Sequence, residues 1–299
     1  MIWSHYTFLY LLFFLFLVFS ILLFIKKKEK EGFIQSSSFI LKTKEDIYDT
    51  FYAQIYNTIH EPNQNADFIT DIIIQDTFAN TKTSVVLIIG CETGFLANQL
   101  QNKGIDTYII DHSKDMIHHA LQIYPTLKTK IGNINNPMLY DKSTFSHILC
   151  IGMMIYSIQD KITFFRHIYH WLISGGYFII QVVNRDKFNT IIPGGKSNIL
   201  LHPEDFTTQR ITETNINFGK FHYKSKYCFD QLQDNNKVTM TETFTDQKTN
   251  KVRQNEHIMY MEPLDTIIEY LLYCGFIIKG QFNVIHDKHQ FIYIVERPN

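Results

Sequence analysis

Cysteine is scarce in this chain and its copies are never clustered. The four cysteines, Cys91, Cys150, Cys228 and Cys274, lie far apart in the sequence. There is no Cys-x-x-Cys pair, and no group of histidines and cysteines has the spacing of a zinc site. We therefore expect reduced thiols, no disulfide framework and no structural metal.

The chain also has almost no net charge. Its 28 Lys and Arg residues face 29 Asp and Glu residues, which leaves a formal net charge of −1. A domain that binds nucleic acid usually carries an excess of basic residues, and this balance offers none. Nucleic acid is therefore not an expected partner.

A long hydrophobic run occurs at the N-terminus. In residues 6–25 the polar groups are Thr7, Ser20 and two tyrosine hydroxyls, and twenty such residues are enough for a helix to cross a bilayer core. Four lysines follow at positions 26–30, no Lys or Arg precedes the run, and no small-residue cleavage site follows it. This pattern favours an anchor over a cleaved signal peptide, and we expect a single-pass membrane protein whose remaining chain lies on the cytosolic side.

The segment that predicts a ligand site begins with five apolar residues, 85–89. This run is β-branched and short, and Gly90 ends it, which is typical of a strand buried on both faces of a parallel sheet. Residues 95–102 then read as a helix that begins directly after Gly94. A strand, a glycine turn and a helix N-terminus together predict a site for a polar ligand above the turn.

A second apolar strand, residues 105–110, ends in Asp111. A carboxylate at this place can accept hydrogen bonds from both hydroxyls of a ribose, so a nucleoside is expected across the first two strands. Dinucleotides and S-adenosyl-L-methionine both fit. The dinucleotide fingerprint needs a middle glycine where this chain has Glu92, whose carboxylate would repel a pyrophosphate, and this disfavours NAD.

Four motifs occur in order: residues 86–94, residues 110–116, Gly132-Asn133 and residues 172–176. This set resembles the class I, Rossmann-like S-adenosylmethionine-dependent methyltransferases, chiefly over residues 84–183. The resemblance implies an α/β fold whose sheet is mostly parallel with an antiparallel last strand and has helices on both faces. Gly90 and Gly94 would border the methionine part of the cofactor, Asp111 would hold the ribose, and Asn133 with Ile134 would face the adenine. The full implied cofactor set is Gly90, Cys91, Glu92, Gly94, Asp111, His112, Asn133, Ile134 and Ile151.

The chain departs from the family pattern at four positions. The family usually has acids where this chain has Ile88, Asn133 and Ser146, and a glycine at the position of Glu92. Asn133 can still accept a hydrogen bond from the adenine amino group. Glu92 could replace the lost acid by facing the cationic amino group of the cofactor, or it could point to solvent.

The remaining segments suggest a cover and a substrate region. Residues 45–59 and 66–78 read as helices, and residues 185–262 as an inserted lid that contains a hairpin turning near residues 246–248. Residues 263–299 read as a helix and a terminal hairpin. The fourth strand, residues 145–151, should present Met154 and Tyr156 to the substrate, although both could equally be core. The expected organisation is an anchor at residues 1–25, a tether at 26–41 and a methyltransferase domain at 42–299.

We expect a membrane-anchored methyltransferase that acts on a small-molecule or lipid-like acceptor. No residue stands out as catalytic; His202, Glu256 and His257 in the lid are candidate bases without a distinguishing spacing. Two alternatives are an inactive module that keeps the cofactor site, suggested by Ile88, Glu92 and Ser146, and a nucleotide-cofactor oxidoreductase. Acceptor and oligomeric state are not determined by the sequence.

Overall fold

A computed structural model describes residues 35–61, 63–192, 212–229, 236–285 and 287–299, with single positions between residues 10 and 19. In this part of the chain, no helix is both long and apolar enough to cross a membrane. The anchor predicted at residues 6–25 lies almost wholly outside the described residues, as does His202.

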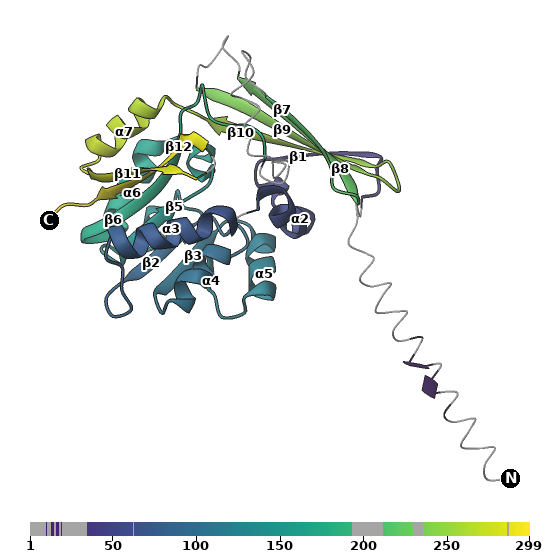
Figure 1. Ribbon diagram of the computed structural model, residues 1–299, viewed down its shortest axis with the longest axis horizontal. Helices are drawn as coiled ribbons and strands as arrows, with labels where there is room; N and C mark the ends of the chain where they lie inside the picture. Colours follow the sequence, from purple (N-terminus) through teal and green to yellow (C-terminus); the bar gives the residue numbers. More distant parts are fainter. Residues whose placement is uncertain are drawn as a thin grey trace.

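The larger of two sheets has seven strands in the order β11-β12-β6-β5-β2-β3-β4 (Figure 1). Neighbouring strands from β6 to β4 are parallel, whereas β12 runs antiparallel to β6, and β11 to β12. The predicted mostly parallel sheet with a terminal antiparallel hairpin is thereby confirmed. The strands are β2 (Val85–Ile89), β3 (Asp106–Asp111), β4 (Lys128–Ile131), β5 (Phe145–Cys150), β6 (Leu172–Val183), β11 (Ile277–Val284) and β12 (Asp287–Glu296).

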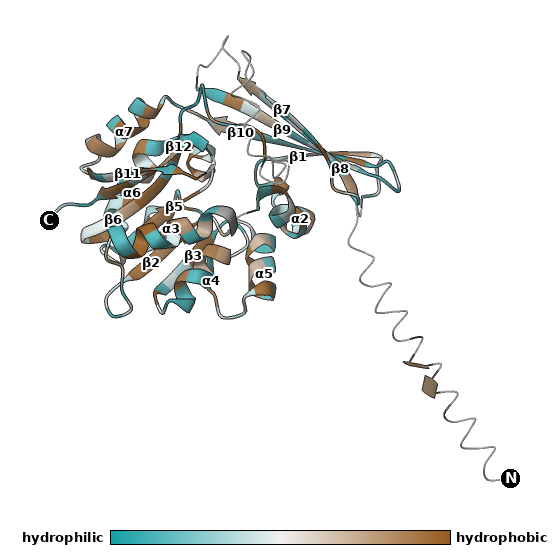
Figure 2. Ribbon diagram, viewed as in Figure 1, coloured by the Kyte–Doolittle hydropathy of each residue, from teal (hydrophilic) through white to brown (hydrophobic). Residues whose placement is uncertain are grey.

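Helices cover both faces of this sheet. Leu87 and Ile89 of β2 point into one buried cluster with the helices α6 and α7, and Val86 and Ile88 point into another with α3, α4 and α5. Figure 2 shows β2 coloured as hydrophobic, as a strand buried on both faces should be. The helices are α3 (Asn63–Asp76), α4 (Phe95–Asn102), α5 (Lys114–Ile123), α6 (Lys161–Trp171) and α7 (Leu264–Tyr273), and the short 3-10 turns of this layer are η2 (Pro137–Leu139) and η3 (Met154–Ser157).

The predicted lid supplies four strands of a second, five-stranded sheet, in the order β1-β10-β9-β8-β7, and its fifth strand, β1, comes from the N-terminal segment. The hairpin expected near residues 246–248 is confirmed as the antiparallel pair β9 and β10. Buried side chains alternate along β8 and β9, so one face of the sheet is covered and the other is more open. The strands are β1 (Phe39–Thr43), β7 (Glu213–Asn217), β8 (Phe221–Phe229), β9 (Lys237–Asp246) and β10 (Val252–Tyr260).

Two N-terminal expectations need correction. The tether expected to reach residue 41 ends earlier, because β1 pairs in parallel with β10 and the Gln35 side chain donates to the Val252 carbonyl at 3.1 Å. The single helix expected at residues 45–59 is a 3-10 turn, η1 (Lys44–Ile47), followed by α2 (Thr50–His60). Asp49 separates them because its side chain accepts from the Tyr52 amide and caps α2.

Helix α2 lies between the seven-stranded sheet and the five-stranded sheet (Figure 1). Its apolar side packs on the covered face of the smaller sheet, where Tyr52 and Ile59 are buried against Tyr223 and Phe244. The N-terminal segment therefore joins the cofactor-binding layer to the lid.

Candidate active site

The turn after β2 depends on left-handed backbone conformations. Gly90, Glu92 and Gly94 have φ values of 88°, 45° and 80°, and Gly94 is the N-cap of α4. A Cβ atom at Gly94 would lie 2.5 Å from Leu127, so glycine is needed there for close packing as well as for its φ. In the family that this chain resembles, a glycine usually stands at the position of Glu92. Glu92 adopts the left-handed conformation that a glycine adopts easily.

Asp111 joins the ends of the first two parallel strands. Its Oδ2 accepts a hydrogen bond of 2.7 Å from the Cys91 amide, and its Oδ1 accepts one of 2.8 Å from the Ser113 amide. Only 10% of its side chain is exposed, and His112 Nδ1 lies 3.5 Å from Oδ1. An ionised carboxylate has about four acceptor positions, so two fixed bonds leave capacity for the hydroxyls of a ribose.

Glu92 points inward rather than to solvent. A Cβ atom built on Gly152, which follows β5, would lie 3.2 Å from its Oε1, so the carboxylate reaches across the ends of β2 and β5. Burial raises the pKa of Glu92 to about 7. No hydrogen bond or ion pair holds this carboxylate within the described chain.

The residues expected near the adenine lie beyond β4. Asn133 is exposed, and its amide oxygen accepts from the Asn135 amide at 2.9 Å, which leaves its second acceptor position free. Ile134 and Ile151 are half-buried. The Ile134 carbonyl lies 3.3 Å from His167 Nδ1, which fixes this loop to α6.

Of the two expected substrate residues, one lies at the site and one lies in the core. Met154 is half-buried in η3, and its Cγ and Sδ would lie 3.7 Å from a Cβ on Gly90. Tyr156 is fully buried; its hydroxyl accepts from the Val183 amide at 2.8 Å and donates to the Val183 carbonyl. The structure therefore brings Met154 to the carboxyl ends of the strands and uses Tyr156 to join η3 to β6.

Two other departures from the family pattern are structural in this chain. Ile88 is buried in the apolar cluster with α3, α4 and α5, so it offers no polar anchor. Ser146 lies near the amino end of β5, where its hydroxyl bonds the Val85 amide at 2.8 Å and the Val85 carbonyl at 3.0 Å. Ser146 therefore lies at the opposite end of the strands from Gly90 and Asp111.

Tyr48 lies beside the cofactor turn, a position that the sequence did not predict. Its ring packs edge-on against His112, with centroids 5.3 Å apart, and lies 6.2 Å from the His257 ring of the lid. The Ser113 hydroxyl donates to the Tyr48 carbonyl at 2.5 Å. Nothing in the local pattern of residues 45–59 predicts these contacts, because each one joins segments far apart in the sequence.

A buried carboxylate in the lid was also missed. Glu242 is fully buried, and its Oε2 lies 2.7 Å from His257 Nε2 and accepts from Asn255 Nδ2 at 3.2 Å. Its Oε1 accepts from the hydroxyls of Tyr223 and Tyr52 at 2.9 and 3.3 Å. The sequence did contain a signal, since a predicted hairpin that places an acid and a histidine on one face can pair them.

Burial alone would raise the pKa of Glu242, because it disfavours the charged form. His257, His60 and the hydrogen bond from Asn255 oppose this effect, and together they hold the pKa of Glu242 well below its usual range. Four donors, from Tyr52, Tyr223, Asn255 and His257, also converge on its two oxygens and stabilise the charged form when the histidines are neutral, so we treat this carboxyl as ionised.

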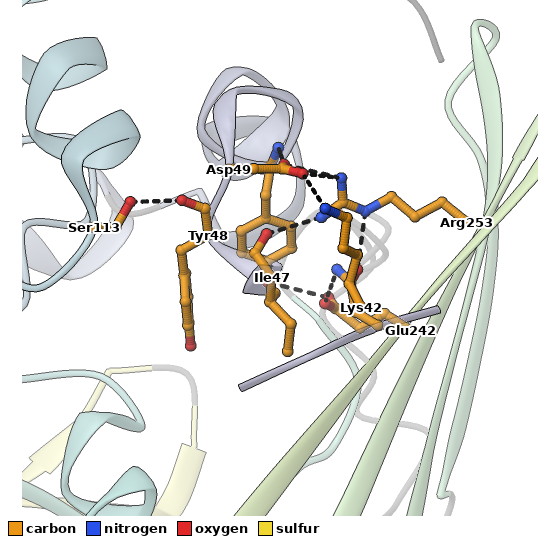
Figure 3. Close-up of polar contacts among 9 residues, drawn as sticks. Lys42, Ile47, Tyr48, Asp49, Ser113, Glu242 and Arg253 are labelled. Atoms are coloured by element: carbon orange, nitrogen blue, oxygen red, sulfur yellow. Dashed lines mark hydrogen bonds and ion pairs between the residues drawn. The ribbon is translucent and has the colours of Figure 1, made fainter. Parts of the chain in front are cut away.

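A three-sided clamp holds the segment between η1 and α2 (Figure 3). Arg253 of β10 binds both carboxylate oxygens of Asp49 at 2.9 and 2.8 Å and donates to the Ile47 carbonyl at 2.8 Å. Lys42 of β1 pairs with the same Asp49 at 3.4 Å, and Ser113 holds Tyr48 from the cofactor side. The clamp fixes Tyr48 between the two sheets.

The fold and part of the sequence match known proteins. The chain is similar to a crystal structure of an S-adenosylmethionine-dependent methyltransferase from Clostridium acetobutylicum, with 19% identity, a TM-score of 0.63, and coverage of 83% of this chain and 98% of that one. It is also similar to the CcbJ methyltransferase from Streptomyces caelestis, with 12% identity, a TM-score of 0.64, and coverage of 86% and 100%. No curated protein sequence matches it.

A third similar structure is that of SAM-bound CalS10, an amino pentose methyltransferase from Micromonospora echinaspora, with 12% identity, a TM-score of 0.57, and coverage of 85% of this chain and 99% of that one. At such identities these likenesses show the fold. The family model described as "Methyltransferase domain" matches residues 56–225, more than half of the chain. The prediction of an S-adenosylmethionine-dependent methyltransferase enzyme is thereby confirmed at the level of the family: this chain belongs to the methyltransferase-domain family.

Proposed function

We propose that this enzyme transfers the methyl group of S-adenosylmethionine to a small-molecule acceptor. The observation that carries the proposal is Asp111, whose carboxylate ties the ends of β2 and β3 together and keeps free acceptor capacity. Support for a small acceptor comes from two structural neighbours, the amino pentose methyltransferase CalS10 and the sugar N-methyltransferase KedS8 from Streptoalloteichus.

The residues at this edge of the sheet fit the cofactor. Asp111 would accept from the ribose hydroxyls, and the glycine turn would allow close approach of the methionine part. Glu92 is an inward carboxylate without a counter-ion in the described chain, which suits the cationic amino group of the methionine moiety. When bound, the cofactor supplies a methyl carbon made electrophilic by its sulfonium, so the protein mainly positions the acceptor and excludes water.

The N-terminus extends the proposal to a membrane. Residues 6–25 have the length and composition of a membrane span, and Lys26 to Lys30 would lie on the cytosolic side. Because β1 begins at Phe39, the segment between the apolar run and the lid sheet could reach at most about 45 Å. An enzyme held so close to the bilayer would have access to lipid-like acceptors as well as soluble ones.

Calorimetry with S-adenosylhomocysteine tests the cofactor site. We expect residues 35–299 to bind S-adenosylhomocysteine but not NAD, and Asp111→Ala to weaken binding by roughly 100-fold, since two charge-assisted hydrogen bonds would be lost. Asp106→Ala is the matched control, because Asp106 begins the same strand and pairs with Lys128 in an exposed ion pair. Equal affinity of wild type and Asp111→Ala would refute the proposed site.

Activity requires a second experiment. Purified enzyme, tritiated S-adenosylmethionine and the small-molecule and lipid fractions of a cell extract should give a labelled product. Binding of S-adenosylhomocysteine without any methyl transfer to either fraction would instead favour the inactive cofactor-binding module, which the replacement of the family acid by Ile88 first suggested.

A further inference from the structure

The covered face of the lid sheet carries a histidine and a carboxylate in direct contact. His257 of β10 and Glu242 of β9 are 2.7 Å apart, and their side chains are 15% and 0% exposed. In the antiparallel pairing, Glu242 lies opposite Asn255 and Met240 lies opposite His257. The side chains of Glu242 and His257 are therefore on the same face of the sheet, the one that packs against α2. A buried carboxylate beside a partly exposed imidazole is an arrangement that can orient a base.

The contact fixes the proton positions on His257. Because Glu242 is ionised and can only accept, Nε2 of the neutral imidazole must carry the proton and donate it. Nδ1 then holds the free lone pair. No described residue forms a hydrogen bond with Nδ1, and this atom is not among the fully buried unsatisfied ones. His257 therefore has a free basic nitrogen that is at least partly accessible.

One aromatic ring separates this pair from the cofactor turn. The Tyr48 ring lies edge-on to both the His257 ring and the His112 ring, with centroids 6.2 and 5.3 Å apart, and His112 follows Asp111. The 3-10 turn η3, which carries Met154, lies beside β10. His257 is thus positioned on the lid side of the site that we propose for the cofactor.

We propose that His257 is the general base of the methyl transfer, that Glu242 positions it, and that the acceptor atom is an amine nitrogen that arrives as an ammonium ion. This inference rests on the proposed function. The nitrogen loses its proton to Nδ1 of His257 and keeps the electron pair, this pair forms the bond to the methyl carbon, and the pair of the breaking C–S bond remains on sulfur. The proton then passes from His257 to water.

The charges around the site select an ammonium ion over a neutral or anionic acceptor. Glu242 faces His257 from β9, and Glu92 and Asp111 lie at the strand ends across Tyr48. Arg253 is on the same strand as His257, but it is paired with Asp49, and His60 of α2 is half-buried, with its pKa lowered to about 4 by desolvation. A cation is attracted by these carboxylates and by tyrosine ring faces, whereas a carboxylate acceptor is repelled and needs no base.

The other candidate bases do not occupy this position. Glu256 precedes His257 on β10 and therefore lies on the opposite face of the sheet, next to Thr241 and Thr43 in register. This makes Glu256→Gln a matched control for Glu242→Gln. On β8, His222 alternates with the buried Phe221 and Tyr223 and lies on the more open face, so His222→Gln is the matched control for His257→Gln.

The pH dependence of kcat tests the base. His257→Gln should lower kcat at pH 8 by roughly 100-fold and should abolish the fall in kcat toward acidic pH that a general base gives the wild-type enzyme. Added imidazole should restore activity to His257→Ala. Glu242→Gln should shift the fall in kcat at acidic pH to a lower pH, because the carboxylate that stabilises the protonated His257 is lost. The two control variants should keep the wild-type profile.

Two readouts keep the inference separate from the proposed function. Unchanged affinity for S-adenosylhomocysteine shows that a variant is folded. If folded His257→Gln keeps the wild-type kcat, the role of His257 as general base is refuted, whereas the proposed methyl transfer is not. The atom that carries the label in the extract product must be nitrogen; a methyl ester would overturn the ammonium acceptor. Diethyl pyrocarbonate should modify His257 at pH 8, and this experiment needs no acceptor. If His257 does not react in protein that binds S-adenosylhomocysteine, the proposal that it is the general base is refuted.

Discussion

At the scale of single residues, the site depends on one unusual choice, a glutamate in a left-handed turn. Glu92 combines a φ of 45° with a desolvated carboxylate that points at Gly152. A non-glycine residue in this conformation is destabilising, and so is an unpaired acid that burial partly removes from water. Glu92 therefore lowers the stability of the free enzyme, and binding of a cation beside its carboxylate would offset this effect.

This cost predicts a pH-dependent gain in stability for Glu92→Gln. Burial raises the pKa of Glu92 to about 7, from an ordinary value of 4.5 in the unfolded chain. Between these pH values the folded state holds the extra proton, so the stability of the wild type falls as pH rises and is constant above 7. Glu92→Gln lacks this loss, and we expect it to be more stable at pH 8 by roughly 1–3 kcal/mol.

Urea denaturation of the free enzyme at pH 4.5 and pH 8 measures this difference. The gain should shrink to nearly zero at pH 4.5, where the carboxyl is protonated in the folded state and about half protonated in the unfolded chain. A gain of the same size at both pH values would mean that relief of backbone strain, and not of charge, explains it.

The residues that the sequence predicted are those whose role is set by a few neighbours in the chain. Gly90, Gly94 and Asp111 lie at strand ends that local hydrophobic patterns reveal, and the structure puts them together. Tyr48 was missed because its partner His112 is 64 positions away, and no local pattern encodes such a distance. For Glu242 the predicted hairpin did offer a signal, the pairing with His257, but the contact with Tyr52, 190 positions away, could not be predicted.

At the scale of elements, the clamp of Arg253 should dominate the link between α2 and the lid. Arg253 makes two bonds to Asp49, one to the Ile47 carbonyl and one of 2.9 Å to Asn255, and it is almost fully buried. Arg253→Lys cannot reproduce this fork, and it should lower the free energy of unfolding by roughly 2–4 kcal/mol.

Lys42→Gln is the control for this prediction. Lys42 pairs with the same Asp49 but is much more exposed, so its loss should cost less than about 1 kcal/mol in the same denaturation experiment. Similar losses for the two variants would show that the buried fork has no special role.

The first strand of the lid was not predicted, and its pairing has a direct consequence for truncation. A hairpin such as β9 and β10 can be predicted from two adjacent runs of alternating polar and apolar residues. In contrast, β1 is only five residues long and pairs with β10 across more than two hundred residues. A chain that begins at residue 42 cuts through β1, although the sequence alone placed the domain boundary there.

We therefore expect a chain that begins at residue 44 to be less stable than one that begins at residue 35. The shorter chain exposes the edge of β10 and loses the Gln35 contacts with the lid. Thermal unfolding should show a decrease in Tm of at least several degrees, roughly what a loss of 1–2 kcal/mol gives in a domain of this size. An unchanged Tm would show that β1 contributes little to the lid.

At the scale of the whole molecule, two sheets meet on one short N-terminal segment. The residues from Lys42 to Tyr52 contact the lid through Arg253 and Glu242, and the cofactor layer through Ser113. The parallel sheet could be predicted because its strands are hydrophobic runs in an ordered motif set. The joining of the sheets could not, because it depends on buried polar contacts whose partners come from three separate parts of the chain.

The same segment connects the enzyme to the predicted anchor. Since β1 belongs to the lid, a membrane span at residues 6–25 would hold the lid side of the molecule near the bilayer. We expect the full chain to float with phosphatidylcholine vesicles in a density gradient and to resist extraction by carbonate at high pH, because about twenty apolar residues would be buried in the hydrocarbon core. The chain that begins at residue 35 should remain at the bottom of the gradient while it binds S-adenosylhomocysteine with the same affinity. Release of the full chain by carbonate would contradict a spanning anchor, and flotation of the shorter chain would place membrane binding on the lid instead.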